Sequence, residues 1–144
     1  VLPTLIGQLA QIKALDLDPV VTLAGLDSVR DFCDVRDVVQ CYIAVMERAD
    51  SGDVFNVGSG TGTKIGELFE IARAATGMEH VRVEVDTSRL GPDPLPYLVA
   101  DASLAGERLG WSAPTDLQTT IRDMFNYEVQ FLSASRAQDG SGVE

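Results

Sequence analysis

The stretch Val29–Val39, which reads VRDFCDVRDVV, decides how the rest of this 144-residue chain is interpreted. Arg30 and Asp31 come at the end of a strand-like stretch. Asp34 then suits a helix N-cap, because its carboxylate can accept a hydrogen bond from a free backbone N–H of the first turn. The helix should run to about Ala49, and its apolar residues recur at helical spacing. We expect these residues to form one buried face: Val35, Val38, Val39, Tyr42, Ile43 and Met46.

A guanidinium held at a strand-to-helix junction suits a planar, doubly charged ligand such as a pyrophosphate. Arg30 is therefore a candidate for an anion-binding residue. The alternative is a structural ion pair between Arg30 and a nearby carboxylate. The residue pattern alone leaves both open.

Apolar periodicity predicts further elements on both sides of this stretch. We expect a helix that fades near Leu15, a short strand at Val20–Leu23 with Gly25 in the next turn, and a strand at 54–57 buried on both faces. A helix closed by Gly77, a half-exposed strand over 81–85, a short helix over 101–110 and a last helix to 132 should follow.

The end of the chain gives more local predictions. Leu104 and Leu109 should point inward from the short helix, and Trp111 should pack in the turn that follows it. Thr115 and Gln118 have the spacing of a capping box for the last helix. From Ser133 onward the sequence is polar, so we expect residues 133–144 to be a disordered tail.

A glycine-rich run, Gly58-Ser59-Gly60-Thr61-Gly62, lies between the expected strand and a helix. This order is typical of dinucleotide sites. However, the run reads G-x-G-x-G, so it fits neither G-x-G-x-x-G nor a phosphate loop, although Lys64 follows. We therefore interpret it as a structural turn.

Composition excludes several classes of protein. A hydrophobic content of 45% can build a core, and the formal net charge of −11 with only two lysines argues against a nucleic-acid partner. No apolar run approaches the roughly 20 residues of a membrane helix. Cys33, Cys41 and His80 lack zinc spacing, so we expect reduced thiols in a cytoplasmic protein. The start at Val1, inside an apolar-periodic segment, indicates a partial sequence or a processed N-terminus.

The stretch LDSVRDFCDVRDVVQCYIAVME, residues 26–47, together with FNVGSG at 55–60, resembles the C-terminal half of extended short-chain dehydrogenases that act on nucleotide-sugars. Among these, it most resembles the GDP-6-deoxy-D-mannose reductases, and next the GDP-mannose 4,6-dehydratases. The resemblance covers residues 1–132. It implies the C-terminal portion of a Rossmann-type α/β fold, with short strands and about five helices, that binds the nucleotide-sugar.

The resemblance also implies substrate-binding residues. It places Arg30 on the pyrophosphate and the nucleotide base near Val20–Leu23, which makes Gly25 a candidate as well. Residues 86–101 look like the reductase pattern ARLRPxDxPxLVGD, but its second arginine and its acid fall on Gly91 and Pro94. Arg89 and Asp93 are the neighbouring residues that could replace them.

The complete enzyme of this kind would pass a hydride from NADPH, or NADH, to the C4 ketone of GDP-4-keto-6-deoxy-D-mannose. That chemistry uses a Tyr-x-x-x-Lys pair, yet no tyrosine of this chain has a lysine four residues later. We therefore expect this chain to contain no catalytic, cofactor-binding or metal-binding residue. Its partners would be a GDP-linked deoxyhexose and a missing N-terminal cofactor half.

Other functions stay open. The chain could derive from a GDP-mannose 4,6-dehydratase or another nucleotide-sugar epimerase, or it could be a non-catalytic remnant of the scaffold. The strand at Val54 would normally join a parallel sheet from the missing half. Alone, the chain should therefore be marginally stable or associate with a second copy.

Overall fold

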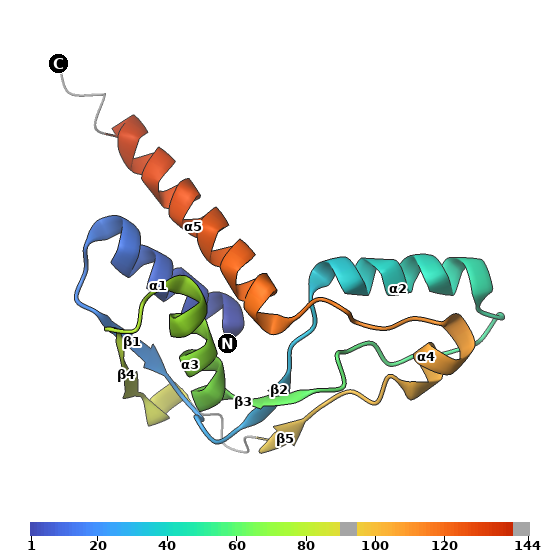
Figure 1. Cartoon of the computed structure of the whole chain (residues 1–144). Coiled ribbons are helices and arrows are strands. Elements are labelled where there is room, and N and C mark those ends of the chain that lie inside the picture. Colours follow the sequence, from blue (N-terminus) through green and yellow to red (C-terminus); the bar gives the residue numbers. More distant parts are fainter. Residues whose placement is uncertain (90–94, 140–144) are drawn as a thin grey trace.

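The computed structural model describes residues 1–89 and 95–139, and it has the predicted α/β character (Figure 1). Within these residues it contains five α-helices, a short 3-10 helix and five short strands. In chain order they are α1 (Leu2–Leu15), β1 (Val20–Leu23), β2 (Val29–Asp31), α2 (Val35–Arg48), β3 (Gly62–Lys64), α3 (Ile65–Thr76), β4 (Arg82–Val85), η1 (Thr87–Arg89), β5 (Tyr97–Leu98), α4 (Ser103–Leu109) and α5 (Leu117–Asp139).

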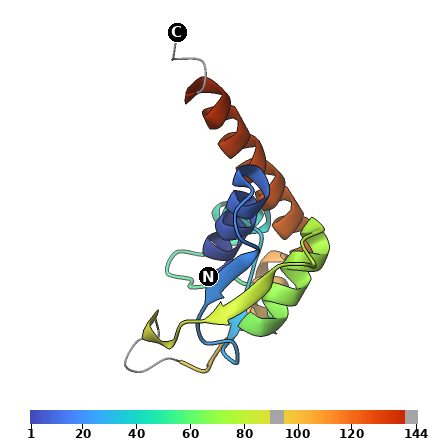
Figure 2. The ribbon, with the colours of Figure 1, turned by 90° about the vertical axis from the view of Figure 1, so that its left-hand side faces the viewer.

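The larger hydrophobic core lies where α1, α3 and α5 pack together beside a two-stranded sheet (Figure 2). The sheet pairs β1 with β4 in parallel, from Val20 opposite Arg82 to Leu23 opposite Val85. The helix predicted to fade near Leu15 is confirmed as α1, and Leu5, Ile6 and Leu9 on its apolar face are fully buried. Gly77 ends α3 with φ near 70°, which a glycine adopts without strain.

A three-stranded sheet with the order β3-β2-β5 lies between this core and the second one. β2 is the central strand, antiparallel to β3 and parallel to β5. Arg30 therefore lies in the middle of the sheet, opposite Thr63 on one side and Leu98 on the other.

The smaller core joins α2 to α4. Cys41 and Ala44 of α2 contact Ala105, Leu109 and Trp111 there. The indole Nε1 of Trp111 donates a hydrogen bond to the backbone oxygen of Asp37 at 2.8 Å. Burial of Leu109 and Trp111 agrees with the sequence prediction. Leu104, in contrast, is 46% exposed, because only the face of α4 with Ala105 and Leu109 lies against α2.

The prediction that the large apolar residues of α2 form its buried face is wrong. Its buried residues are Asp37, Cys41 and Ala44, whose small side chains let α4 and Trp111 approach. The large apolar residues point outward, and Val35 is 70% and Met46 is 79% exposed. Periodicity identified an amphipathic helix correctly, but within the described residues nothing covers its larger apolar face.

The predicted strand at 54–57 does not form in this structure. Val54 is 80% exposed, and no strand of the described residues lies beside this segment to pair with it. A strand needs a neighbour to satisfy its backbone groups. The predicted strand needs such a neighbour, which the described part of the chain lacks.

The last helix differs from prediction at both ends. Asp116, not Thr115, caps it, since the Asp116 carboxylate accepts hydrogen bonds from Thr119 N at 2.9 Å and Thr119 Oγ1 at 2.8 Å. The helix also continues through 133–139, where we expected disorder. Arg136 Nη1 donates to Ala14 O at the end of α1, at 3.3 Å. No helix among the described residues is both long and apolar enough to span a bilayer.

Candidate functional site

Arg30 is half-buried and lines an open cavity of about 430 Å³. The cavity walls come from β2, the segment 56–58 and residues 98–101. The Arg30 guanidinium donates one hydrogen bond, from Nη1 to the neighbouring Val29 O at 2.7 Å. Among the described residues, no carboxylate forms an ion pair with it. The structural ion pair considered as the alternative is therefore not formed there, and the other guanidinium N–H groups can reach a ligand.

The two carboxylates of this cavity are already engaged by other groups. Asp101 accepts hydrogen bonds from Ser103 N at 3.0 Å and from Ser103 Oγ. The hydroxyl of Ser103 lowers the pKa of Asp101, which keeps this acid ionised. Asp31 is engaged by the backbone of two loops. Both carboxylates thus bind neutral donors, and Arg30 is the cationic side chain that lines this cavity without a carboxylate of the described residues paired to it.

Asp31 holds the glycine-rich loop in place. Its carboxylate accepts hydrogen bonds from Ser59 N at 2.9 Å, Gly60 N at 3.0 Å and Ala100 N at 3.2 Å, and a further one from Ser59 Oγ at 2.5 Å. The loop approaches so closely that a Cβ on Gly58 would lie 2.6 Å from Asp31 Oδ2. Ser59 N and Gly60 N are thus occupied by the Asp31 carboxylate and Thr61 N by Ser59 Oγ, so these three N–H groups are not free to cradle a phosphate. The loop is a structural turn, as its spacing predicted.

The start of the following helix is also unavailable to an anion. Ile65 N donates to Ser28 O at 3.0 Å, and Gly66 N donates to Leu26 O at 2.9 Å. Free N–H groups at a helix start are what normally bind phosphate. The loop and the helix together therefore do not form a dinucleotide site.

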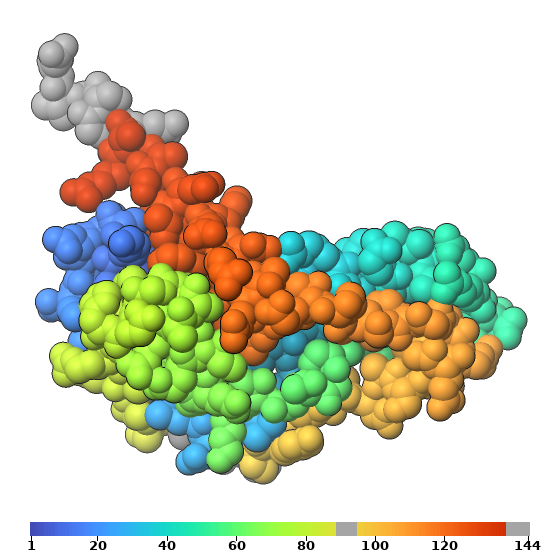
Figure 3. All heavy atoms as spheres, viewed as in Figure 1, coloured from blue at the N-terminus to red at the C-terminus, as the bar shows by residue number. Residues whose placement is uncertain are grey.

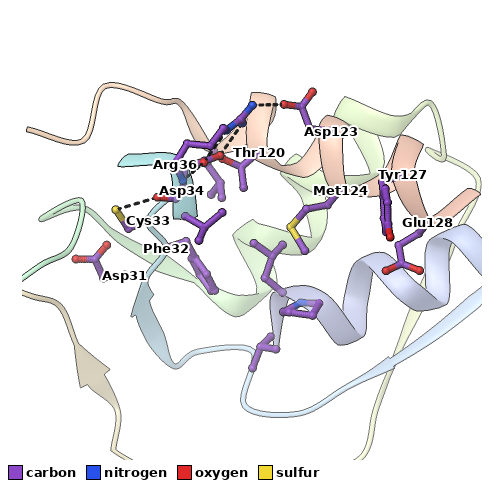
Figure 4. A pocket seen from close by; sticks show the side chains of 15 residues that line it. Asp31, Phe32, Cys33, Asp34, Arg36, Thr120, Asp123, Met124, Tyr127 and Glu128 are labelled. Carbon is purple, nitrogen blue, oxygen red and sulfur yellow. Dashed lines mark hydrogen bonds and ion pairs between the residues drawn. The ribbon is translucent and has the colours of Figure 1, made fainter. Parts of the chain in front are cut away.

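A second cavity, of about 740 Å³, lies where the segment 31–36 faces the start of α1 and the first turns of α5 (Figure 4). Phe32 and Met124 point into it, and Tyr127 and Glu128 lie at its far side (Figure 4). Asp31 and Cys33 line both cavities. The segment after β2 therefore lies between two cavities, the polar one that Arg30 lines and this mainly apolar one.

A buried carboxylate fixes the start of α2. Asp34 is 4% exposed and caps the helix by accepting from Arg36 N at 2.8 Å, as predicted. The same carboxylate binds the Arg36 guanidinium at 2.8 Å and 2.7 Å, and Thr120 Oγ1 at 2.7 Å. The hydrogen bonds from Arg36, and then that from Thr120, hold the pKa of Asp34 well below its usual range. Arg36 also reaches Asp123 of α5 at 2.8 Å (Figure 4).

A second buried carboxylate, Asp37, ties α2 to the segment before α5. It accepts hydrogen bonds from Thr115 N at 2.9 Å and Thr115 Oγ1 at 3.0 Å. Asp34 and Asp37 are therefore structural, and they hold the segment that follows Arg30. Sequence reasoning identified the cap but not these partners, since Thr115 and Thr120 are distant in the sequence.

Neither cysteine is activated as a nucleophile. Cys33 and Cys41 are free thiols, and burial together with the charges of Asp37 and Asp31 raises the pKa of Cys33. A thiol that stays protonated reacts poorly. In addition, no three His, Cys, Asp or Glu side chains within 1–89 and 95–139 are grouped as a metal site.

Of the other predicted substrate-binding residues, the structure fully describes only Gly25. Gly25 lies in the turn after β1, with φ near 62°. Arg89 is at the end of η1, but its side chain lies outside what the structure describes. Asp93 falls outside the described residues altogether. The roles of these three residues stay predictions.

The chain is similar to known proteins in sequence and in fold. The model of the GDP-mannose 4,6-dehydratase family matches residues 1–124. UDP-glucose 4-epimerase of Corynebacterium glutamicum is 32% identical over 103 residues, which is 69% of this chain and 30% of that protein.

Two solved structures extend the comparison. UDP-glucose-4-epimerase from Stenotrophomonas maltophila, with bound NAD and formylated UDP-arabinopyranose, is 30% identical with a TM-score of 0.74, over 92% of this chain and 40% of that one. RMD from Pseudomonas aeruginosa, complexed with NADPH, shares the fold at 23% identity with a TM-score of 0.78, over 91% of this chain and 42% of that one. The chain thus spans less than half the length of each relative.

Proposed function

This chain belongs to the GDP-mannose 4,6-dehydratase family, within the extended short-chain dehydrogenases, and from that premise we propose that it is the nucleotide-sugar-binding part of an NAD(P)-dependent sugar-nucleotide oxidoreductase. The observation that carries the proposal is the Arg30 guanidinium, which faces a cavity of about 430 Å³ with no carboxylate of the described residues paired to it. We assign Arg30 to the diphosphate of the ligand. The proposed setting is the cytoplasm.

The sugar substrate that we propose is GDP-4-keto-6-deoxy-D-mannose, reduced at its C4 ketone in the complete enzyme. The pattern RDFCDVRDVV and the GDP-mannose family match support a guanine nucleotide. The alternative is a dehydratase or an epimerase for another nucleotide-sugar, and the UDP named for two of the relatives favours it. We also propose Gly25, Arg89 and Asp93 as secondary contacts.

The residues of this chain do not fit a nicotinamide dinucleotide. The N–H groups of Ser59 and Gly60 in the glycine-rich loop are held by Asp31, and no tyrosine is followed by a lysine at the fourth position. The dinucleotides named for the neighbouring structures would therefore bind to the part of the enzyme that this chain does not cover. In our proposal this chain binds and orients the nucleotide-sugar, while the redox step needs the other part.

Calorimetric titration of the full chain with GDP and with UDP tests the proposal. We expect saturable binding that weakens about 10- to 100-fold in Arg30→Ala, because a charge-assisted hydrogen bond contributes roughly 1.5–3 kcal/mol and each 1.4 kcal/mol is tenfold in Kd. Arg82→Ala, which removes an exposed arginine of β4, is the matched control and should bind as the parent does.

The same titration separates the alternatives. Tighter binding of GDP than UDP supports the reductase or dehydratase, and the reverse order supports an epimerase. A non-catalytic remnant is the second candidate, favoured by Gly91 and Pro94 where the reductase pattern has an arginine and an acid. Binding of neither nucleotide, or equal binding by Arg30→Ala and the parent, would refute the assignment of Arg30.

A further inference from the structure

The strand β2 is short, and both of its neighbours stop pairing with it at or before Asp31. Figures 1 and 3 show β3, in green, and β5, in gold, at the lower edge of the molecule, and β2 lies between them. The pairing with β3 ends where Asp31 lies opposite Gly62, and the pairing with β5 ends where Arg30 lies opposite Leu98. The backbone beyond these points needs other acceptors for its N–H groups.

The Asp31 side chain supplies such acceptors on both sides of β2. One carboxylate oxygen, Oδ1, accepts from Ser59 N at 2.9 Å and from Ser59 Oγ at 2.5 Å. The other oxygen, Oδ2, accepts from Gly60 N at 3.0 Å and from Ala100 N at 3.2 Å. A single side chain thus ties the glycine-rich loop and the segment after β5 to the end of β2.

The segments that Asp31 ties together are walls of the Arg30 cavity. That cavity is lined by β2, by the start of the glycine-rich loop with the residues before it, and by the segment that follows β5. The two outer walls also touch each other, since a Cβ on Gly58 would lie 2.6 Å from Ala100 Cβ. Asp31 therefore fixes how far both outer walls stand from the strand that carries Arg30.

The negative charge of Asp31 by itself disfavours an anion in this cavity. Its donors are three backbone N–H groups and a hydroxyl, all of them neutral, so they do not cancel the charge. An uncharged amide could not do the same work, because each carboxylate oxygen accepts two hydrogen bonds and an amide has only one acceptor oxygen. The geometry that the carboxylate imposes, and not its charge, therefore accounts for an acid at this position.

We propose that Asp31 is a positioning residue of the nucleotide-sugar site, which it builds by holding the two outer walls of the Arg30 cavity against β2. It acts through the backbone of both walls, while Arg30 binds the diphosphate. The inference rests on the proposed function. Charge and geometry make opposite predictions here, because removal of the charge alone strengthens the binding of an anion, whereas release of a wall weakens it.

Calorimetric titration of the full chain with GDP measures the sign of this effect in Asp31→Asn. The amide has the size of the carboxylate but satisfies only one of the two pairs of donors, so part of the wall structure is released. We expect Kd to rise about 10-fold, the lower end of what removal of an orienting partner costs at a binding site. Asp116→Ala is the control: it removes the cap of α5, lies outside the residues that line the cavity, and should bind as the parent does.

A double-variant cycle separates positioning from a general loss of structure. In the Arg30→Ala background, Asp31→Asn should change Kd by less than about 2-fold, because the walls matter for a ligand that Arg30 holds. Circular dichroism checks that each variant is folded. If Asp31→Asn does not fold, Ser59→Ala, which removes one donor to Oδ1, measures the same effect with an expected rise in Kd of about 2- to 3-fold.

Three results would overturn the inference and leave the assignment of Arg30 intact. They are GDP binding by Asp31→Asn, or by Ser59→Ala in its place, that equals or exceeds that of the parent, an equal loss in the parent and Arg30→Ala backgrounds, and an equal loss in Asp116→Ala. A parent chain that binds no nucleotide would refute the proposed function, and the inference with it.

Discussion

Replacing Asp34 by alanine should destabilise the chain by about 2–3 kcal/mol. The substitution removes the N-cap of α2, worth about 1 kcal/mol. It also leaves Arg36 and Thr120 without their acceptor, and hydrogen bonds to a charged group contribute roughly 1.5–3 kcal/mol. We take the lower part of that range, because the Arg36 side chain is 56% exposed and water replaces part of what it loses.

Asp34→Asn separates the charge from the cap. Asparagine caps helices as well as aspartate does, so this variant should lose only about 1–2 kcal/mol. The Arg36 guanidinium depresses the pKa of Asp34 in the folded state. The stability that this carboxylate adds is therefore complete above its unfolded pKa of about 3.9 and is lost as the pH falls through the folded pKa. The parent should lose stability below about pH 4 more steeply than Asp34→Asn does.

Urea unfolding followed by circular dichroism at pH 7, and acid titration from pH 7 to pH 2, measure both effects. Asp123→Asn is the matched control, because Asp123 binds the same guanidinium but is 52% exposed, and we expect it to cost less than about 0.5 kcal/mol. Two results would contradict the structural role of the Asp34 carboxylate. One is a loss of unfolding free energy below about 0.5 kcal/mol for Asp34→Ala, and the other is an equally steep loss of stability with falling pH in the parent and in Asp34→Asn.

Three further predictions concern packing. Gly58→Ala should cost about 1–3 kcal/mol in urea unfolding, because its Cβ would lie 2.6 Å from both Ala100 Cβ and Asp31 Oδ2; a neutral result would mean that the loop is not pinned by Asp31. Gly7→Ala should stabilise by about 0.5–1 kcal/mol in the same assay, since a Cβ there meets nothing within 4 Å and lies inside α1; destabilisation would contradict the helix geometry. The isolated chain should associate through its bare α2 face, and Met46→Glu should lower its weight-average mass in sedimentation equilibrium. Sharp, concentration-independent unfolding of a monomer would count against this.

The sequence predicted those elements whose partners lie within the chain. The first helix, the existence of the last helix, the strands at Val20 and Arg82, the Asp34 cap and the turn at Gly77 all agree with the structure. In each case the local pattern and the packing partner are both present. Periodicity and turn chemistry then suffice.

Two of the failures, the buried face of α2 and the strand at 54–57, share one physical cause. An apolar stripe shows that a helix is amphipathic but not which element covers the stripe, and no described residue covers that of α2. The strand predicted at Val54 does not form for a similar reason, because a strand needs a neighbouring backbone to pair with. The cap at Asp116 was missed for a different reason. Thr115 instead donates hydrogen bonds to Asp37, a residue 78 positions away in the sequence. Helix at 133–139 depends on a contact with α1 that polarity does not reveal.

The sequence pattern predicted that Arg30 lies at a junction of strand and helix. It could not predict that the Arg30 guanidinium has no paired carboxylate among the described residues. That depends on the fold, in which the adjacent acid, Asp31, binds the glycine-rich loop instead of the arginine. Within residues 1–89 and 95–139, that arrangement leaves the Arg30 guanidinium without a paired carboxylate, as the proposed role requires.

The most direct measurement of the central claim is an NMR titration that follows the side-chain Nε–H resonance of Arg30 while GDP is added to the full chain. The account predicts a saturable shift of this resonance, with inorganic pyrophosphate moving it in the same direction and guanosine leaving it unchanged. GDP that binds while the Arg30 resonance stays still, and that instead moves residues remote from β2, would contradict it.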